Sequence, residues 1–484
     1  MGRKQSNAFF CLDGIQMDCI RFYSNTPTRG ERSMRIIGLD IGTTTISVVV
    51  LDCETGRIQA SRTIGNEADL APDIPGGKLQ DPNIIIEKLC RVLDELKAQY
   101  APIAAIGIDG QMHGVVYVDA QGKAVSPLYT WQDNRGNAPL GEGSYVSEMK
   151  RLTGCEMSSG FGLATHFWMT KNNRIPEGAV KLCSIFDYAA MCLTGRKTPL
   201  MHSSGAASFG MFDLYKRCWM EDEIAACGMD ISYLPEITSG CALAGITADG
   251  IPVSCGIGDN QASFIGSVRE ADSSVLVNMG TGGQISMKGF THHPAEDLEI
   301  RPIIDDAYII AGSMLCGGRA YAMLEGFIRD VASLSGYDGG KLYEAMNAVA
   351  NASIEIENPW KVDTRFSGSR RQPEIRGSIQ GIGIDNFDAK HLIGGLLNGI
   401  VDETMDLYAK MLQAEVNRPT ELIGSGNGLR RNAALRRAYE RRFGLEMKIP
   451  AHNEEATYGA ALYGMVAAGL AKSLNEAQKL IRYE

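Results

Sequence analysis

The 484-residue chain lacks several features that would assign it to a class of protein directly. No apolar run approaches the roughly 18 residues that a membrane-spanning helix needs, so we expect no membrane partner. Basic residues do not predominate: the formal net charge is -10. A nucleic-acid partner is therefore not expected, because neutralising phosphates requires a basic face. The composition favours a small soluble ligand.

The 12 cysteines include no CxxC pair. We expect no secretory leader, a cytoplasmic location and reduced thiols that fill the core. None of the three Gly-Lys pairs is followed by Ser or Thr, so a Walker P-loop is absent. A nucleotide would have to be held in another way.

The length predicts two domains of roughly 200 residues each, because one core of this size would be too large. In residues 1–33 the apolar residues recur with neither a helical nor a strand period, and Met34 directly precedes the first strong predicted strand. We expect these 33 residues to be a non-structural extension. A transit peptide fits them poorly because Asp13, Asp18 and Glu31 lie within them.

Four glycine-rich segments follow or precede apolar, strand-like runs. They are IIGLDIGTTT (36–45), GIGDNQAS (256–263), VLVNMGTGG (275–283) and LIGSGNGLRRN (422–432). Glycine beside a small hydroxyl residue or an Asp allows the backbone to approach a polyanion closely. The set predicts a site for phosphate groups.

The pattern of predicted elements occurs twice. Strands at 36–39 and 46–51 form a hairpin, a helix spans 85–100, and a strand follows at 103–108. The second half gives a strand at 275–278, a Gly-Thr turn and a following strand that completes a hairpin, then a helix at 392–412 and a strand at 422–423. Duplicated domains that face each other across a cleft would produce this order.

Two aspartates are the strongest chemical candidates. Asp40 ends an apolar strand, where a buried carboxylate is costly unless it is paired or bound to a metal. Beside Gly42 and Thr43, it could hold Mg²⁺ through water, although a hairpin turn alone would also explain the motif. Asp259 follows a strand-like run and the flexible Gly256 and Gly258, so it is the candidate for a general base that accepts a proton from a substrate hydroxyl. In its plainer interpretation, Asp259 is only the N-cap of a helix that starts at Gln261.

The late glycine loop suits a nucleotide. Gly424, Gly426 and Asn427 precede helix-forming residues, so adenosine could lie over the loop near a helix N-terminus. A dinucleotide fingerprint is a poorer interpretation, because that motif belongs to a first βαβ unit.

Five further segments complete a family pattern: GQMHGVV (110–116), TWQDNR (130–135), SGFGLATHFW (159–168), FDYAAMCLTG (186–195) and AASFGMF (206–212). With the four glycine-rich segments they resemble the FGGY carbohydrate kinases, and within that family the sedoheptulokinases. The resemblance implies an α/β fold of two ribonuclease-H-like domains, as in actin, hexokinase and the heat-shock ATPases. Mixed sheets would flank an interdomain cleft, with sugar bound by residues 34–270 and ATP by residues 271–484.

The resemblance also implies roles for individual residues. Asp259 would be the base, and Asp40 would bind Mg²⁺. Sugar contacts would come from Gln111, Met112, His113, Trp131, Asp133 and Asn260. ATP contacts would come from Gly42, Thr43, Thr44, Gly280, Thr281, Gly282, Gly424, Gly426, Asn427 and Asn432.

Plainer interpretations of three groups stay open. His113 could be a hydrogen-bonded structural residue, and Arg135 could simply pair with Asp133. The loop at 365–382 contains Arg365, Arg370, Arg371 and Arg376, which either help to position phosphates or hold the domain interface, or form a solvated basic loop.

The function expected first is ATP- and Mg²⁺-dependent phosphorylation of a ketose primary hydroxyl, with sedoheptulose giving sedoheptulose 7-phosphate. The alternatives are xylulokinase, whose pattern Asn260 matches better, another FGGY kinase acting on ribulose, a different ketose or a polyol, and a catalytically silent sugar sensor. The expected partners are the sugar and ATP, and a homodimer is left open.

Overall fold

The computed structural model describes residues 34–290, 295, 297–304, 307–353, 356–369, 372–414 and 416–484. The expected N-terminal extension, and Arg370 and Arg371 of the basic loop, lie outside these residues. Arg376 donates to the carbonyl oxygens of Pro373 and Ile375 in its own loop, at 2.7 and 2.8 Å.

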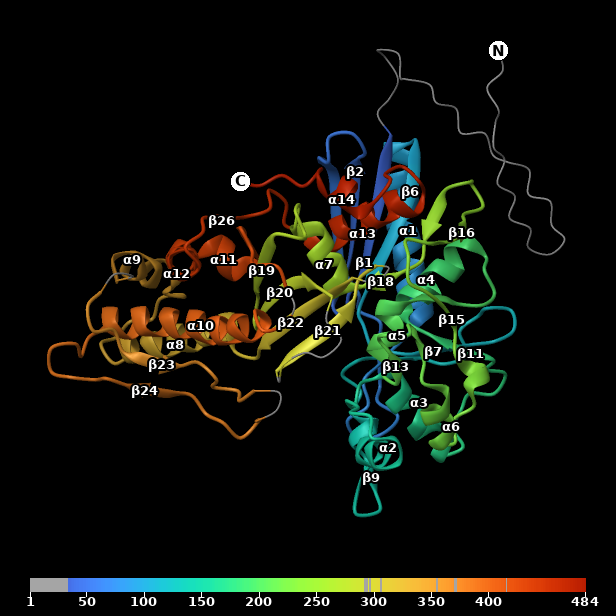
Figure 1. The fold of residues 1–484 in the computed structure, drawn as a ribbon, viewed down its shortest axis with the longest axis horizontal. Coiled ribbons are helices and arrows are strands. Elements are labelled where there is room, and N and C mark those ends of the chain that lie inside the picture. The colour runs from blue at the N-terminus through green and yellow to red at the C-terminus, as the bar shows by residue number, and fades with distance from the viewer. Residues whose placement is uncertain are drawn as a thin grey trace, which may run out of the picture. The chain divides into compact units, whose positions relative to one another are not determined.

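The first sheet is built on the predicted hairpin (Figure 1). Its order is β16-β17-β6-β1-β2-β3, and β18 also pairs with β6. Strands β1 and β2 are antiparallel, whereas β6 runs parallel to β1. The bounds are β1 (Arg35–Ile41), β2 (Thr45–Asp52), β3 (Ile58–Gly65), β6 (Ile103–Gly110), β16 (Leu243–Ile246), β17 (Pro252–Ser254) and β18 (Ile257–Gly258).

The second sheet repeats this arrangement. Its order is β21-β22-β20-β19-β25-β26, in which β19 and β20 form an antiparallel hairpin and β25 runs parallel to β19. The repeated order that the sequence predicted is therefore confirmed. The bounds are β19 (Ser274–Met279), β20 (Gly283–Gly289), β21 (Leu298–Pro302), β22 (Tyr308–Met314), β25 (Glu421–Ser425) and β26 (Met447–Lys448).

Helices cover both sheets, and the predicted ones form close to their expected bounds. Helix α1 (Pro82–Tyr100) begins where Asp81 accepts a hydrogen bond from the Asn83 amide at 2.8 Å, and Pro82 occupies its first turn. The helix expected at 392–412 is α10 (Ala389–Met411). Other helices are α2 (Tyr145–Thr153), α3 (Gly162–Lys171), α4 (Ile185–Thr194), α5 (Ser203–Phe209), α8 (Gly317–Ser333), α9 (Tyr343–Ser353), α11 (Asn427–Arg431) and α12 (Ala433–Phe443).

Two helices far apart in the sequence pack together beside the first sheet. Helix α7 (Asp259–Ser267) lies against α13 (Glu455–Ala467), and α13 also packs on β1 and β6. A Cβ atom on Gly459 would collide with the Ala262 carbonyl, and one on Gly266 would collide with the Glu455 carbonyl. The two helices therefore approach at backbone distance. Although α13 comes late in the chain, it packs on the first sheet and belongs to a core cluster that includes residues of both sheets.

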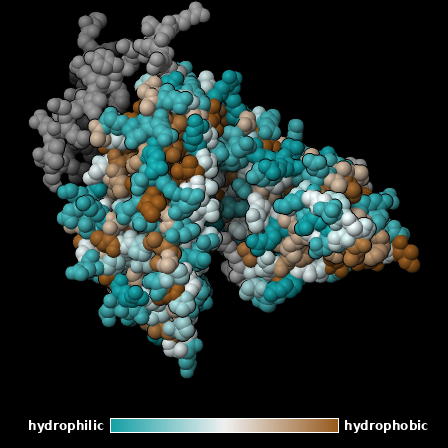
Figure 2. Space-filling model, turned by 180° about the vertical axis from the view of Figure 1, so that it is seen from behind, coloured by the Kyte–Doolittle hydropathy of each residue, from teal (hydrophilic) through white to brown (hydrophobic). Residues whose placement is uncertain are grey.

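The surface seen in Figure 2 is mostly hydrophilic, with hydrophobic side chains scattered or gathered toward the outer end of one half. Among the residues that the structure describes, no helix has the length and apolar character needed to cross a membrane.

Candidate active site

A cleft of about 1070 Å³ opens between the edges of the two sheets. The first half contributes most of its walls, and β21 and the start of β20 contribute the opposite side. Its lining includes Gly42, Thr43, Gln111, Met112, His113, Trp131, Asp259, Asn260, Gln284, Glu299 and Arg301. Of the residues assigned to the sugar from the sequence, only Asp133 is missing from this lining.

Three aspartates meet at the carboxyl ends of neighbouring strands. Asp40 of β1 pairs in register with Asp109 of β6, and Gly258 of β18 pairs with Gly110, so Asp259 follows directly. Burial raises the pKa of Asp40 to about 7, and the negative charge of Asp259 adds to the shift. This edge of the sheet therefore concentrates negative charge in a poorly solvated position.

Asp259 is the first residue of helix α7, whose N-cap is Gly258. It therefore does not cap a helix beginning at Gln261, which was its plainer interpretation. Its Oδ1 accepts a hydrogen bond from Asn260 Nδ2 at 2.9 Å. Burial raises the pKa of Asp259, while its hydrogen bonds with Asn260 and the charge of Arg301 act in the opposite direction.

A chain of hydrogen bonds links the first glycine turn to the residues expected to bind sugar. Trp131 Nε1 donates to Thr43 Oγ1 at 2.9 Å, and Thr43 Oγ1 donates to Gln111 Oε1 at 3.2 Å. Gln80, in β5 (Leu79–Gln80), accepts from Gln111 Nε2 at 3.2 Å and donates to the Thr43 carbonyl at 2.8 Å. Thr43, which was expected to bind ATP, is thus held by Trp131, Gln111 and Gln80. Thr44, which was also expected to bind ATP, is exposed.

His113 is held rigidly at the cleft wall. Its backbone has a positive φ of 74°, its ring stacks on Phe161 with 4.7 Å between centroids, and its Nδ1 donates to the Ser208 carbonyl at 2.7 Å. When the imidazole is neutral, this bond leaves Nε2 as an acceptor. His113 is therefore both a structural residue and part of the cleft lining.

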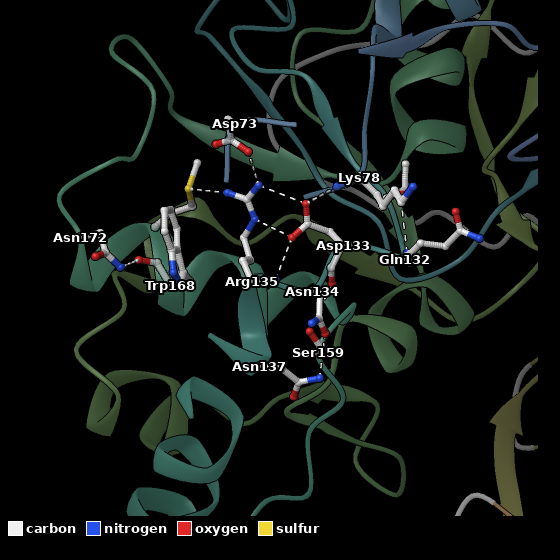
Figure 3. Close-up of polar contacts among 12 residues, drawn as sticks. Asp73, Lys78, Gln132, Asp133, Asn134, Arg135, Asn137, Ser159, Trp168 and Asn172 are labelled. Carbon is white, nitrogen blue, oxygen red and sulfur yellow. Dashed lines mark hydrogen bonds and ion pairs between the residues drawn. The ribbon is translucent and has the colours of Figure 1, made fainter. Parts of the chain in front are cut away.

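Asp133 lies away from the cleft, which corrects its expected contact with sugar. Its Oδ1 accepts from Arg135 Nε at 2.7 Å and its Oδ2 accepts from the Lys78 amide at 3.0 Å (Figure 3). Arg135 is fully buried, also pairs with Asp73 at 2.9 Å, and packs over the ring of Trp168. The simple Asp133–Arg135 pair is what forms, and it supports the loop that carries Trp131.

The glycine segments of the second half lie next to one another. In the turn at Gly280–Gly282, the Gly280 carbonyl accepts from the Gly318 amide at 3.1 Å, and the Thr281 carbonyl accepts from Arg319 at 2.9 Å. Gly426, with a φ of 83°, lies against the Met279 backbone. The turn, the start of the 17-residue helix α8 and the loop before α11 therefore adjoin.

Two other residues assigned to ATP differ in their surroundings. Asn427 is exposed in this loop. Asn432 is buried and caps α12, where its side chain accepts from the Leu435 amide at 3.0 Å.

Comparison with known proteins decides the family. The model of the FGGY family of carbohydrate kinases, N-terminal domain, matches residues 35–266, and that of the FGGY C-terminal domain matches residues 275–468. The chain belongs to the FGGY family of carbohydrate kinases. It is therefore an ATP-dependent sugar phosphotransferase.

The relatives of this FGGY kinase include kinases named for different sugars and one named for glycerol. Mouse sedoheptulokinase (Mus musculus) is 28% identical over 88% of this chain and 96% of its own length. A xylulose kinase structure from Brucella ovis has a TM-score of 0.79 at 23% identity, over 93% of each chain. Plasmodium falciparum glycerol kinase, solved with ADP, has a TM-score of 0.76 at 19% identity, over 93% of each chain.

The FGGY kinase also brings residues to the cleft that sequence reasoning did not assign. Arg301 donates to Glu299 at 2.6 Å and to Gln284 at 3.1 Å. No motif marked these three residues, because their positions depend on how the second sheet meets the first. Asp109 is different: it ends an apolar strand just as Asp40 does, so the same reasoning could have found it.

Proposed function

We propose that this enzyme transfers the γ-phosphoryl group of ATP to a primary hydroxyl of a ketose, and that its preferred reaction converts sedoheptulose to sedoheptulose 7-phosphate. The observation that carries the proposal is one cleft that unites Asp259, the polar group around Gln111, and Arg301 from the second sheet. The similarity to mouse sedoheptulokinase supports the choice of sugar.

In the proposed mechanism, Asp259 accepts the proton of the attacking hydroxyl. The hydroxyl oxygen forms the new bond to phosphorus while the bond between the γ-phosphorus and the bridging oxygen breaks, and ADP leaves with the electron pair. Asp259 suits this role because burial raises its pKa and makes it a stronger base than an exposed carboxylate. Asn260 holds one carboxylate oxygen and leaves the other for the sugar.

The sugar would lie against the first half, where the polar groups of Gln111 and His113 offer partners for its hydroxyls and Trp131 offers an apolar face. Met112 and Asn260 complete this wall. In this proposal Asp133 does not contact the sugar, because its oxygens already accept hydrogen bonds from Arg135 and Lys78. It supports the loop that carries Trp131 instead.

ATP would lie on the second half, with residues 34–270 proposed as the sugar-binding domain and 271–484 as the ATP-binding domain. The turn Gly280–Gly282 adjoins the N-terminus of α8, whose positive dipole end favours phosphate oxygens. The Gly318 and Arg319 amides donate to the carbonyls of this turn and so hold it at the helix end. Gly424, Gly426 and Asn427 would support the nucleoside, and Gly42, Thr43 and Thr44 would meet the phosphates from the other side. Asn432 would act indirectly by fixing α12.

A magnesium ion fits the residues at Asp40. Within the described residues, no group of three His, Cys, Asp or Glu side chains is placed to hold a metal. Mg²⁺ commonly takes only one or two carboxylates together with waters and substrate phosphates. When bound, it would neutralise charge on the β- and γ-phosphates, and Asp40 would hold one of its waters.

The test is ADP release measured with sedoheptulose, xylulose, ribulose, fructose and glycerol at matched concentrations. We expect the highest kcat/KM with sedoheptulose, and phosphorus NMR should show a phosphate on a primary carbon. Turnover of xylulose far above sedoheptulose would favour xylulokinase instead. ADP release that no sugar stimulates would contradict the proposal as a whole.

A further inference from the structure

Among the carboxylates that the structure describes, Asp109 stands out because both of its buried oxygens lack a donor group. Its side chain is 0% exposed, and among the described residues no N–H or hydroxyl group donates to either of its oxygens; its one side-chain partner is the carboxyl group of Asp40. Other buried carboxylates are satisfied at least in part: Asp133 accepts from Arg135 and Lys78, and Asp187 accepts from the hydroxyl of Ser184 at 2.7 Å. An ionised carboxylate without donors is costly inside a protein, so this position calls for a compensating charge.

The neighbours of Asp109 are themselves negative. It pairs in register with Asp40 on the adjacent parallel strand, and neighbouring strands lie about 4.8 Å apart with paired side chains on the same face. Burial raises the pKa of Asp109 well above its usual range, and the charges of Asp40 and Asp259 raise it further. Within the described part of the chain, Asp109 forms no ion pair with Lys, Arg or His. Within the described residues no cation compensates the charge of Asp109, and a metal ion from solution could supply that compensation.

We propose that Asp109 is a second carboxylate of the magnesium site, which acts with Asp40 to draw one divalent cation to the carboxyl ends of β1 and β6. This inference rests on the proposed function, in which Asp40 serves Mg²⁺ beside the phosphates. Two carboxylates supply the charge that one divalent cation neutralises, and the remaining ligands are waters and phosphate oxygens. The metal ion would then supply the positive charge that no described side chain gives to Asp109.

The test of this inference is a titration of the full chain with Mn²⁺ alone. The electron paramagnetic resonance signal of free Mn²⁺ measures how much of the metal is bound. Asp109→Asn keeps the shape and removes the charge, and Asp109→Ser removes the charge with a smaller side chain. We expect both to weaken Mn²⁺ binding by roughly 10- to 100-fold, as losses of metal-supporting groups commonly do. Asp187→Asn is the matched control, because Asp187 is also buried and carries an unpartnered oxygen but lies on α4. It should bind Mn²⁺ like wild type.

Thermal unfolding gives a second readout that does not depend on catalytic turnover. Without metal, Asp109→Asn should be at least as stable as wild type, because it relieves the repulsion by Asp40. With Mg²⁺, wild type should gain stability and Asp109→Asn should gain less. A structural role, or a proton shared between Asp40 and Asp109, would instead leave Mn²⁺ binding of both variants within about twofold of wild type, and that result would overturn the inference.

The two proposals fail in different ways. If no sugar stimulates ADP release but Asp109→Asn loses Mn²⁺, the proposed reaction is wrong and the metal site stands. If sedoheptulose is phosphorylated but both Asp109 variants bind Mn²⁺ like wild type, the reaction stands and Asp109 has no part in the metal site.

Discussion

Trp131 Nε1 donates a hydrogen bond to Thr43 Oγ1 across 88 positions of the sequence, at 2.9 Å. This bond fixes an indole that is otherwise 47% exposed at the cleft. It also connects the loop after β8 (Leu128–Tyr129) to the turn between β1 and β2. The wall proposed for the sugar and the turn proposed for the phosphates are therefore one hydrogen-bonded unit.

Replacing Trp131 with Phe should keep the apolar face and remove this bond. A hydrogen bond of this kind contributes about 0.5–1.5 kcal/mol, so KM for the sugar should rise by roughly 2- to 10-fold with a smaller change in kcat. Thr43→Val removes the other partner, so the double variant should lose less than the sum of the single losses. Strictly additive losses in steady-state assays would mean that the bond has no role in sugar binding.

Replacing Asp259 with Asn should lower kcat by about 10²–10⁴-fold, because the hydroxyl proton loses its acceptor. For wild type, the raised pKa of Asp259 means that protonation disables the base at a higher pH than for an exposed carboxylate. We therefore expect kcat/KM to fall as the pH drops through this pKa and to recover above it. The pH profile of ADP release checks the direction, and full turnover by the Asn variant would refute the assignment.

Replacing Arg301 with Gln should act on both the reaction and the pH profile. Arg301 is the cation whose charge lowers the pKa of Asp259, so its loss should move the acid limb of kcat/KM to higher pH. It should also lower kcat by about 10²-fold if the guanidinium stabilises charge on the transferred phosphoryl group. Arg91→Gln, which removes an exposed arginine paired with Glu87 on α1, is the control. Equal behaviour of the two variants would contradict the role given to Arg301.

The sequence predicted local structure better than side-chain direction. Apolar period and turn residues were enough for both hairpins and for α1 and α10, because these features depend on nearby residues. The contact assigned to Asp133 did not follow, because Arg135 turns inward against Trp168 and occupies the carboxylate. No local pattern reveals such a turn of a side chain.

The sequence did not identify the cleft residues of the second sheet, for a related reason. Arg301 and Gln284 reach the cleft only because β20 and β21 face the first half, a relationship set by tertiary packing. Asp109 could have been identified from the sequence, because it lies near the end of an apolar strand just as Asp40 does. The pairing of the two aspartates in register needed the parallel alignment of β1 and β6.

Replacing Gly459 with Ala should disturb both stability and catalysis through the contact between α13 and α7. The added methyl group would collide with the Ala262 carbonyl, and backbone cannot yield as a flexible side chain can. The helices must separate, which should cost about 1–3 kcal/mol, as overpacking commonly does. Because Asp259 begins α7, the displacement should also lower kcat.

Gly326→Ala in α8 is the matched control: its site has open space, and alanine favours a helix interior by roughly 0.5–1 kcal/mol. Urea unfolding and ADP release should therefore separate the two variants, and a Gly459→Ala enzyme as stable and active as Gly326→Ala would show that the helices tolerate the added methyl.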